Sequence, residues 1–487
     1  MFSNNLPALS VVLLLMSAYM LPLLAGKRLR TAQAVAVLAL TLTAGFSGFL
    51  FSHVLAYGPM LYSMGGWQAP WGIELAVTPL SAFVMTVVSS IVALVVLSLP
   101  AEQENWQNRK SGWYATLVLL MTASLLGITM ANDLFNLYVF SEVSTIAACA
   151  LVAGKDHRNS TDAAFKYLVL GSIGSGFILF AIGLAYISTG HLNIDFAAAA
   201  LLNNPPHPIV LWAMGSFFLV GFGIKAGLFP LHVWLPDAHS SGPTTASALL
   251  SGVVVKVYAV AMAQVFFGLF GTGLMSAMGL TGLLRLMAVL SILAGSAFAL
   301  VQTDIKRLLA YSTVAQVGYI FLGFGIGGVL GIAAALYHVL AHGLMKAVLF
   351  LTAGKAIDVC GSREIKDFAG MGKRLPVAMS AFTLAALSMI GLPLLAGFGT
   401  KWYLFNAGLE AGIWWVPLLV IVSGLLNAAY FLPVLRSIWF SGEEERAPWR
   451  LWDMPGLPLL AAALVALGLL PGPVLKLLET AAGWLLF

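Results

Sequence analysis

Long apolar runs follow one another along almost the whole chain, and they restrict the folds that it can adopt. A helix needs about 20 predominantly apolar residues to cross roughly 30 Å of hydrocarbon. With 60% hydrophobic and only 9% charged residues among 487, the chain is too apolar for one water-soluble core. The sequence therefore predicts an all-α polytopic membrane protein with about 14 transmembrane helices. We place them near residues 6–26, 32–56, 75–99, 113–131, 133–153, 161–189, 209–227, 243–269, 276–301, 305–327, 329–354, 376–407, 412–440 and 457–486.

Basic residues between the apolar runs predict how the chain is oriented. They fall in alternate connections, whereas the intervening ones contain no Lys or Arg. Because cytoplasmic loops carry the excess of Lys and Arg, both termini are expected on the outer side, in a bacterial inner membrane. The net charge of +5 then reports topology and predicts no nucleic-acid partner. The basic residues concerned are Lys27, Arg28, Arg30, Arg109, Lys110, Lys155, Arg158, Lys306, Arg307, Lys355, Arg363, Lys366, Lys373, Arg374, Arg436, Arg446 and Arg450.

The start of the chain is expected to be a first span. Met1–Gly26 has no basic region before its apolar residues, so a cleavable signal peptide is not predicted.

Two stretches interrupt the apolar runs with residues that break helices. Gly221–Lys256 contains Pro230, Pro236 and Pro243, each of which lacks a backbone donor. Gly391–Lys401 contains a proline and several glycines. Irregular backbone at membrane depth is tolerated only where protein or a water-filled cavity satisfies it. We therefore expect broken seventh, eighth and twelfth spans.

The similar breaks suggest an internal repeat. The proposed organisation is 1–110 for the first three spans, 111–270 for a five-helix unit, 271–440 for its second copy, and 441–487 for the last span. Five is odd, so the two copies would be inverted relative to the membrane, as is typical of transporters with sites near the midplane. Lys225 in the first copy would then correspond to Lys401 in the second.

Three ionisable residues of the first copy lie within apolar runs. Glu142 is about ten residues from either end of its span, so its carboxylate cannot easily reach the headgroups. An isolated carboxylate there costs several kcal/mol, and Lys225 in the broken seventh span is its natural partner. Lys256 lies deeper in the eighth span. Intramembrane ionisable groups indicate proton or ion pathways, although helix packing and snorkelling remain alternatives.

The second copy carries a line of titratable groups. His338, His342 and Lys346 recur at intervals of four residues on one helical face, over about 12 Å. Two His at this spacing could bind a metal, but no HExxH pattern accompanies them. A hydrated proton relay ending at Lys401 is the preferred interpretation, since His titrates near neutral pH.

Other polar residues receive weaker interpretations. His232, Asp237 and His239, in the broken segment, are assigned to capping, structure or proton entry. Asp304, Lys306 and Arg307 resemble an ordinary loop cluster, and the run 443–446 resembles a solvated face. Cys149 and Cys360 form no CxxC pair, and no GxGxxG motif follows a strand. No resident cofactor or metal is therefore expected.

Several motifs together resemble a known family. They are LYVFSE, GIKAGLFPLHVWLPDAHSSGPTTASALLSGVVVK, TDIKRLLAYSTVAQVGY, HVLAHGLMKAVLF and GFGTKWYLF. They are similar to the antiporter-like subunits of respiratory complex I, membrane-bound hydrogenases and Mrp-type cation/proton antiporters, with the D subunit of Mrp antiporters as the preferred type. The resemblance implies fourteen helices, two inverted repeats and a hydrophilic proton axis. By motif, the axis residues are Glu142, Lys225, Lys256, His338, His342, Lys346 and Lys401.

The functional prediction follows from these residues and the resemblance. The chain is expected to translocate protons as one subunit of a monovalent cation/proton antiporter in the lipid bilayer, with other membrane subunits as partners and H⁺ and Na⁺ as candidate ions. The main alternative is a proton-pumping subunit of a redox complex, either NADH dehydrogenase or hydrogenase, with the redox centres in partners. A self-sufficient symporter and a purely structural subunit are further alternatives.

Overall fold

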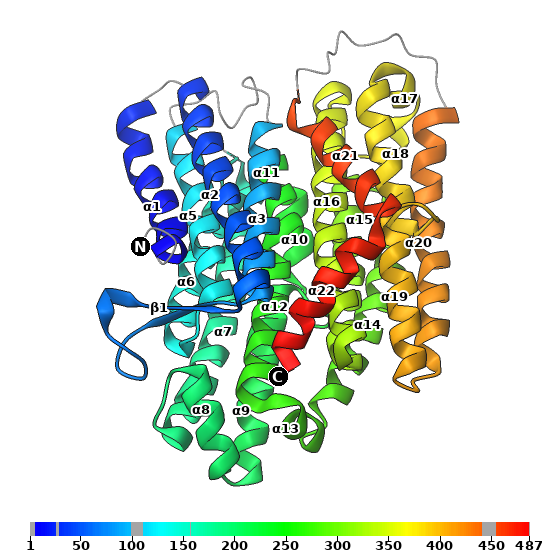
Figure 1. The fold of residues 1–487 in the computed structure, drawn as a ribbon. Helices are drawn as coiled ribbons and strands as arrows, with labels where there is room; N and C mark the ends of the chain where they lie inside the picture. The colour runs from blue at the N-terminus through cyan, green and yellow to red at the C-terminus, as the bar shows by residue number, and fades with distance from the viewer. Residues whose placement is uncertain (1–4, 26–28, 99–110, 156, 441–453, 487) are drawn as a thin grey trace.

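The chain forms a bundle of long helices packed side by side, with one small β-hairpin projecting from it (Figure 1). The computed structural model describes residues 5–25, 29–98, 111–155, 157–440 and 454–486. A helix satisfies nearly all of its own backbone hydrogen bonds, which is what hydrocarbon requires of a spanning segment. The helical, polytopic membrane fold predicted from the sequence is confirmed.

The N-terminal part contains three long helices and the hairpin. Thr78 caps the third helix by accepting a hydrogen bond from Ser81 N, and Pro79 occupies its first turn. Strands β1 and β2 pair antiparallel, with Met60 opposite Val77. These elements are α1 (Leu6–Ala25), α2 (Leu29–Tyr57), β1 (Met60–Ser63), η2 (Met64–Gly66), β2 (Glu74–Val77) and α3 (Pro79–Leu97).

The next part, coloured cyan to green in Figure 1, corresponds to the first predicted unit. Its seventh span ends at Ala226, and a short helix precedes the eighth span. The elements are α5 (Ser111–Met130), α6 (Leu134–Val152), α7 (Arg158–Thr189), α8 (Ile194–Asn203), α9 (Pro208–Ala226), α10 (Trp234–Ser241), α11 (Thr244–Leu249), η3 (Leu250–Val254), α12 (Val255–Val265), η4 (Phe266–Phe270) and α13 (Gly271–Ala277).

The last part runs from green through yellow to red. Its elements are α14 (Leu280–Leu300), α15 (Ile305–Ile326), α16 (Gly328–Cys360), η5 (Ile365–Phe368), α17 (Met371–Arg374), α18 (Pro376–Ile390), α19 (Ala396–Glu410), α20 (Trp415–Phe440), α21 (Gly456–Leu469) and α22 (Pro471–Leu486). Figure 1 shows α21 and α22 crossing the face of the bundle obliquely.

Two predicted spans, the eighth and the fourteenth, differ from the structure, and the break predicted in the seventh follows α9 at Gly227 instead of interrupting the helix. The eighth is not broken over its predicted length: the helix continues from Thr244 to Phe270 through the two π-helical segments η3 and η4, and only then does Gly271 adopt a non-helical φ of +64°. The twelfth is broken as predicted, into α18 and α19 of 15 residues each. The fourteenth is not one straight helix, because α21 and α22 meet at a bend of 85°. Proline at position 471 accounts for that break, since its ring clashes with a preceding carbonyl.

Within the described residues, twelve helices are long and apolar enough to cross a membrane, or thirteen if the bent pair α21 and α22 is one span. The difference from fourteen lies in α18 and α19, which are individually too short. The orientation and the inverted repeat stay predictions. Lys27, Arg28, Arg109, Lys110, Arg446, Arg450 and the run 443–446 lie outside the described residues.

Small residues allow α14 and α15 to pack closely against each other. A Cβ added at Gly295 of α14 would lie 2.6 Å from Ala315 N of α15, and one at Gly318 of α15 would lie 2.8 Å from Ala288 O of α14. Small side chains let backbones approach closely where lipid supplies no hydrophobic drive for association. This pair places α15, which carries several site residues, against the rest of the bundle.

Replacing Gly295 with alanine is expected to destabilise the protein by about 1–3 kcal/mol, because overpacking forces the backbone to shift. The measurement is the thermal midpoint of the purified, detergent-solubilised protein. Gly176→Ala on α7 is the matched control, because nothing lies within 4 Å of its added Cβ. Equal midpoints for the two variants would contradict the close packing of α14 and α15.

Candidate functional site

An ion pair lies between α6 and α9. Lys225 Nζ is 3.3 Å from Glu142 Oε1, with side-chain exposures of 1% and 28% respectively. Ser175 of α7 donates a further hydrogen bond to the same carboxylate oxygen. The sequence predicted this pairing, whereas it did not single out Ser175. The buried Lys225 ammonium thus has a countercharge. Removing either residue would leave the other charge without its partner.

The end of α9 explains why Lys225 can be buried there. Gly227 adopts φ +69°, a left-handed conformation that terminates the helix, and a Cβ there would lie 2.5 Å from a Leu235 methyl group. The indole of Trp234 on α10 donates to Ile224 O at 2.7 Å. The broken segment therefore satisfies a backbone carbonyl beside Lys225, and it holds the last turn of α9 in place.

Lys256 lies on α12, next to the π-helical segment η3. Its ammonium donates to Ser251 O, and only 1% of the residue is exposed. Ser251 Oγ is 2.8 Å from Thr313 Oγ1 of α15, so η3 also connects to the second unit. π-Helical segments alter the local hydrogen-bond pattern and are frequent at functional sites. The predicted break is thus a local irregularity that provides an acceptor for Lys256.

The line of groups predicted on α16 is buried in the structure. The rings of His338 and His342 stack with centroids 5.2 Å apart. Both nitrogens of His342 have no hydrogen-bond partner among the described residues. Lys346 Nζ donates to Leu309 O at 2.7 Å and to Ser312 Oγ at 2.5 Å on α15. The two histidines therefore retain hydrogen-bonding capacity inside an apolar helix bundle.

Lys401 is held differently from Lys225. Its ammonium donates to Met389 O and Ile390 O, the last carbonyls of α18, where the helix dipole favours a cation. No carboxylate lies within ion-pair distance of it in the part of the chain that the structure describes. A pocket of about 290 Å³, lined by aromatic residues including Phe398 and Trp402, adjoins it. Lys225 and Lys401 thus each lie beside a break between helices, but only Lys225 has a countercharge among the described residues.

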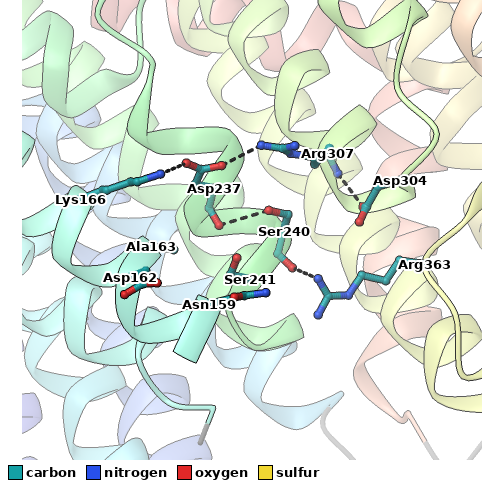
Figure 2. A pocket seen from close by; sticks show the side chains of 10 residues that line it. All are labelled: Asn159, Asp162, Ala163, Lys166, Asp237, Ser240, Ser241, Asp304, Arg307 and Arg363. Carbon is teal, nitrogen blue, oxygen red and sulfur yellow. Dashed lines mark hydrogen bonds and ion pairs between the residues drawn. The ribbon is translucent and has the colours of Figure 1, made fainter. Parts of the chain in front are cut away.

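Asp237 and His239 of α10 have different surroundings. Asp237 bridges Lys166 Nζ at 2.9 Å and Arg307 Nη2 at 2.8 Å, at the edge of a polar pocket of about 350 Å³ (Figure 2). His239 is fully buried, stacks on Phe350 at 5.0 Å, and has no hydrogen-bond partner for either ring nitrogen among the described residues. Asp237 therefore anchors α10, whereas His239 faces the interior.

His232 lies between α9 and α10. It is 7% exposed and packs against Phe229, Phe298 and Tyr311. These aromatic contacts favour its structural interpretation.

The interpretation of Lys306 as part of a loop cluster is wrong. Lys306 is 1% exposed, and its ammonium donates to Gly242 O at 2.9 Å, just after α10 ends. Arg363 likewise donates to Ser240 O at 2.6 Å. Asp304, by contrast, caps α15 by accepting from Arg307 N. Basic residues that follow α14 in the chain thus hold the end of α10. The sequence could not reveal this contact, because Lys306 lies at the boundary of its predicted span, where a lysine is usually exposed.

The described residues contain no group of three or more His, Cys, Asp or Glu placed to hold a metal ion. The residues near the stacked His338 and His342 are hydroxyl, aromatic and lysine side chains. The arrangement can carry and release protons at several buried positions, and that role stays a prediction.

Known proteins resemble this chain over most of its length. The family described as NADH:quinone oxidoreductase/Mrp antiporter, TM, matches residues 131–427. The N subunit of the NADH-quinone oxidoreductase of Desulforudis audaxviator is 43% identical over 386 residues, which cover 79% of this chain and 76% of the relative. The D subunit of the Na(+)/H(+) antiporter of Alkalihalophilus pseudofirmus is 32% identical over 436 residues, which cover 88% and 86%.

A solved structure is similar along nearly the whole chain. One chain of the membrane-bound sulfane sulfur reductase, an archaeal respiratory membrane complex, matches with a TM-score of 0.91 and 31% identity, covering 99% of this chain and 97% of that chain. The family match at 131–427 includes all seven predicted axis residues, Glu142, Lys225, Lys256, His338, His342, Lys346 and Lys401.

Replacing Lys306 with methionine is expected to lower the free energy of unfolding by about 1–3 kcal/mol, because the buried Gly242 carbonyl loses its donor. Arg307→Met is the matched control. The Arg307 side chain, which pairs with Asp237, is 43% exposed, and exposed ion pairs contribute only about 0–1 kcal/mol to stability. Thermal midpoints of the two purified variants test this. A larger loss for Arg307→Met would contradict it.

Proposed function

Because the chain belongs to the NADH:quinone oxidoreductase/Mrp antiporter transmembrane family, we propose that it is the proton-translocating membrane subunit of a multisubunit complex. The observation that carries the proposal is a series of ionisable side chains within the matched region. Glu142 of α6 is 28% exposed, and the predicted axis lysines and histidines from α9 to α19 are buried. Burying one ammonium group costs several kcal/mol, so several in one bundle need a functional reason.

The first step of the proposed path is the Glu142 and Lys225 pair. A proton on Glu142 removes the countercharge of Lys225, and opening of the pair has the same effect. Either event changes the field at Lys256, because charges interact strongly where water is scarce. Electrostatic repulsion between neighbouring lysines then favours release of one proton when another arrives.

The second half of the path runs through α16. Lys256 and Lys346 are both connected to α15. Lys256 donates to Ser251 O, and Ser251 Oγ is hydrogen-bonded to Thr313 of α15. Lys346 donates directly to Leu309 O and Ser312 Oγ of the same helix. The stacked histidines follow, and His338 Nδ1 is 3.1 Å from Thr400 Oγ1, the residue before Lys401. We assign His338 and His342 as relay groups, with water completing the hydrogen bonds that the protein leaves open.

A proton entry is proposed at the polar pocket beside α10. Asp237 and Arg307 line this pocket and anchor the helix. His239, on the same helix, does not line the pocket, and neither of its ring nitrogens has a hydrogen-bond partner among the described residues. It packs against Phe350, whose ring centroid is 5.8 Å from Lys346 Nζ. His239 can therefore pass a proton from the pocket toward Lys346.

Two driving reactions are candidates for the complex. A Na⁺ gradient is supported by the relative named as the D subunit of a Na(+)/H(+) antiporter and by the motif around LPDAHSSGPTTASALLSGVVVK. Electron transfer in partner subunits is supported by the 43% identical relative named as the N subunit of an NADH-quinone oxidoreductase. Vesicles that contain the whole complex distinguish them: a pH change on adding Na⁺ indicates exchange, and one on adding NADH with a quinone indicates redox drive.

The partners follow from the same comparison. The similar solved chain is part of an archaeal respiratory membrane complex. We propose that this chain likewise packs against other membrane subunits, in a bacterial inner membrane with both termini outside.

Lys225→Ala and Glu142→Gln are each expected to reduce proton translocation by about tenfold or more, because the first removes the proposed proton carrier and the second leaves the buried Lys225 ammonium without its countercharge. The measurement is the initial rate of pH change in proteoliposomes that contain the assembled complex. Lys373→Ala is the matched control, since this lysine is exposed on α17. Normal rates in both site variants would refute the assignment of the pair.

A further inference from the structure

A hydroxyl group holds Lys225 more closely than its countercharge does. Lys225 Nζ is 2.7 Å from Thr145 Oγ1 but 3.3 Å from Glu142 Oε1. Thr145 lies on α6 one turn after Glu142, so both reach the same ammonium from one helix face. The sequence did not indicate Thr145, because a threonine is uncharged and is common in apolar helices.

Thr145 is part of a small hydrogen-bond cluster. Its hydroxyl donates to Ser141 O at 2.8 Å, and Tyr258 OH of α12 donates to the same carbonyl at 3.0 Å. The two hydroxyls are 3.2 Å apart, and either can donate to the other. The Tyr258 ring centroid is 5.4 Å from Lys225 Nζ, within the range of a cation–π contact. Tyr258 is two residues from Lys256, so the cluster joins α6, α9 and α12.

The chemistry of this cluster differs from that of a carboxylate. An ionised carboxylate only accepts hydrogen bonds, and it therefore favours the charged form of lysine alone. A hydroxyl both donates and accepts. Thr145 can accept from the ammonium, and it can turn its proton toward a neutral amine, since Tyr258 OH keeps Ser141 O satisfied. The cluster can thus hold Lys225 before and after proton transfer.

We propose that Thr145 is a positioning residue that holds the Lys225 amine in both protonation states, with Tyr258 as its support. The inference rests on the proposed proton-translocating function and identifies what keeps Lys225 in place when its contact with Glu142 opens. Among the described residues, the titratable groups that interact with Lys225 are Glu142 and Cys149 of α6 and Tyr258 of α12. Tyr167 of α7 interacts with Cys149 and Tyr258.

The test compares Thr145→Val, which keeps the shape but removes the hydroxyl, with Thr145→Ser, which keeps the hydroxyl. The assembled complex is reconstituted, and the rate of proton translocation is measured across a pH series. Thr145→Val is expected to lose about tenfold or more in rate and to shift the pH profile, because hydrogen bonds to charged groups are the stronger ones. Thr145→Ser is expected to restore both.

Two reference variants separate the explanations. Thr122→Val on α5 is the matched control, since this buried hydroxyl donates only to Val118 O of its own helix, and it should transport normally. Lys225→Ala reports on the proposed function itself. If the added methyl group of Thr145→Val prevents assembly, Thr145→Ala removes the hydroxyl without adding volume.

The outcomes are distinct. A normal rate and pH profile in Thr145→Val, while Lys225→Ala is inactive, overturns the role of Thr145 and leaves the proposed function standing. An equal loss in Thr145→Val and Thr145→Ser also overturns it, because packing would then be the cause. Normal transport by Lys225→Ala refutes the proposed function. Loss in Thr145→Val with rescue by Thr145→Ser supports the inference.

Discussion

Charged amines buried inside an apolar bundle are the constraint on which this structure depends. Each ammonium needs acceptors that hydrocarbon does not supply, and the cost of leaving it without them is several kcal/mol. The fold provides acceptors by interrupting its helices. Lys401 uses the last carbonyls of α18, Lys256 a carbonyl of the π-helical segment η3, and Lys306 the carbonyl that follows α10. For these three lysines, a helix irregularity or a helix end provides the acceptor of the buried charge.

The short helix α10 connects the two halves of the proposed path. Trp234 at its start contacts the turn that carries Lys225, and His239 near its end stacks on Phe350 beside Lys346. Its far end is held by basic residues that come later in the chain (Figure 2). A displacement of α10 would reach both halves at once, so the element is well placed to couple them.

The two lysines that the predicted repeat would relate, Lys225 and Lys401, have different groups around their charges. Lys225 has a carboxylate and a hydroxyl, whereas Lys401 has backbone carbonyls and an adjoining pocket. The lysines thus differ in what stabilises their charge, although both lie beside a broken helix. On the proposed proton path, the two positions are therefore not equivalent.

The sequence alone indicated the membrane class and nearly all of the spans, because apolar length is a local property. Midspan charge led it to predict the seven axis residues, and their role stays a prediction. It also indicated the Glu142 and Lys225 pair. Only the tertiary structure decided that the eighth span continues through π-helical turns, that the chain bends at position 470, and that Lys306 is buried. It alone revealed Thr145 as the nearest acceptor of Lys225. Such contacts join residues about 80 positions apart, and no local pattern encodes which neutral hydroxyl a distant helix brings to a lysine.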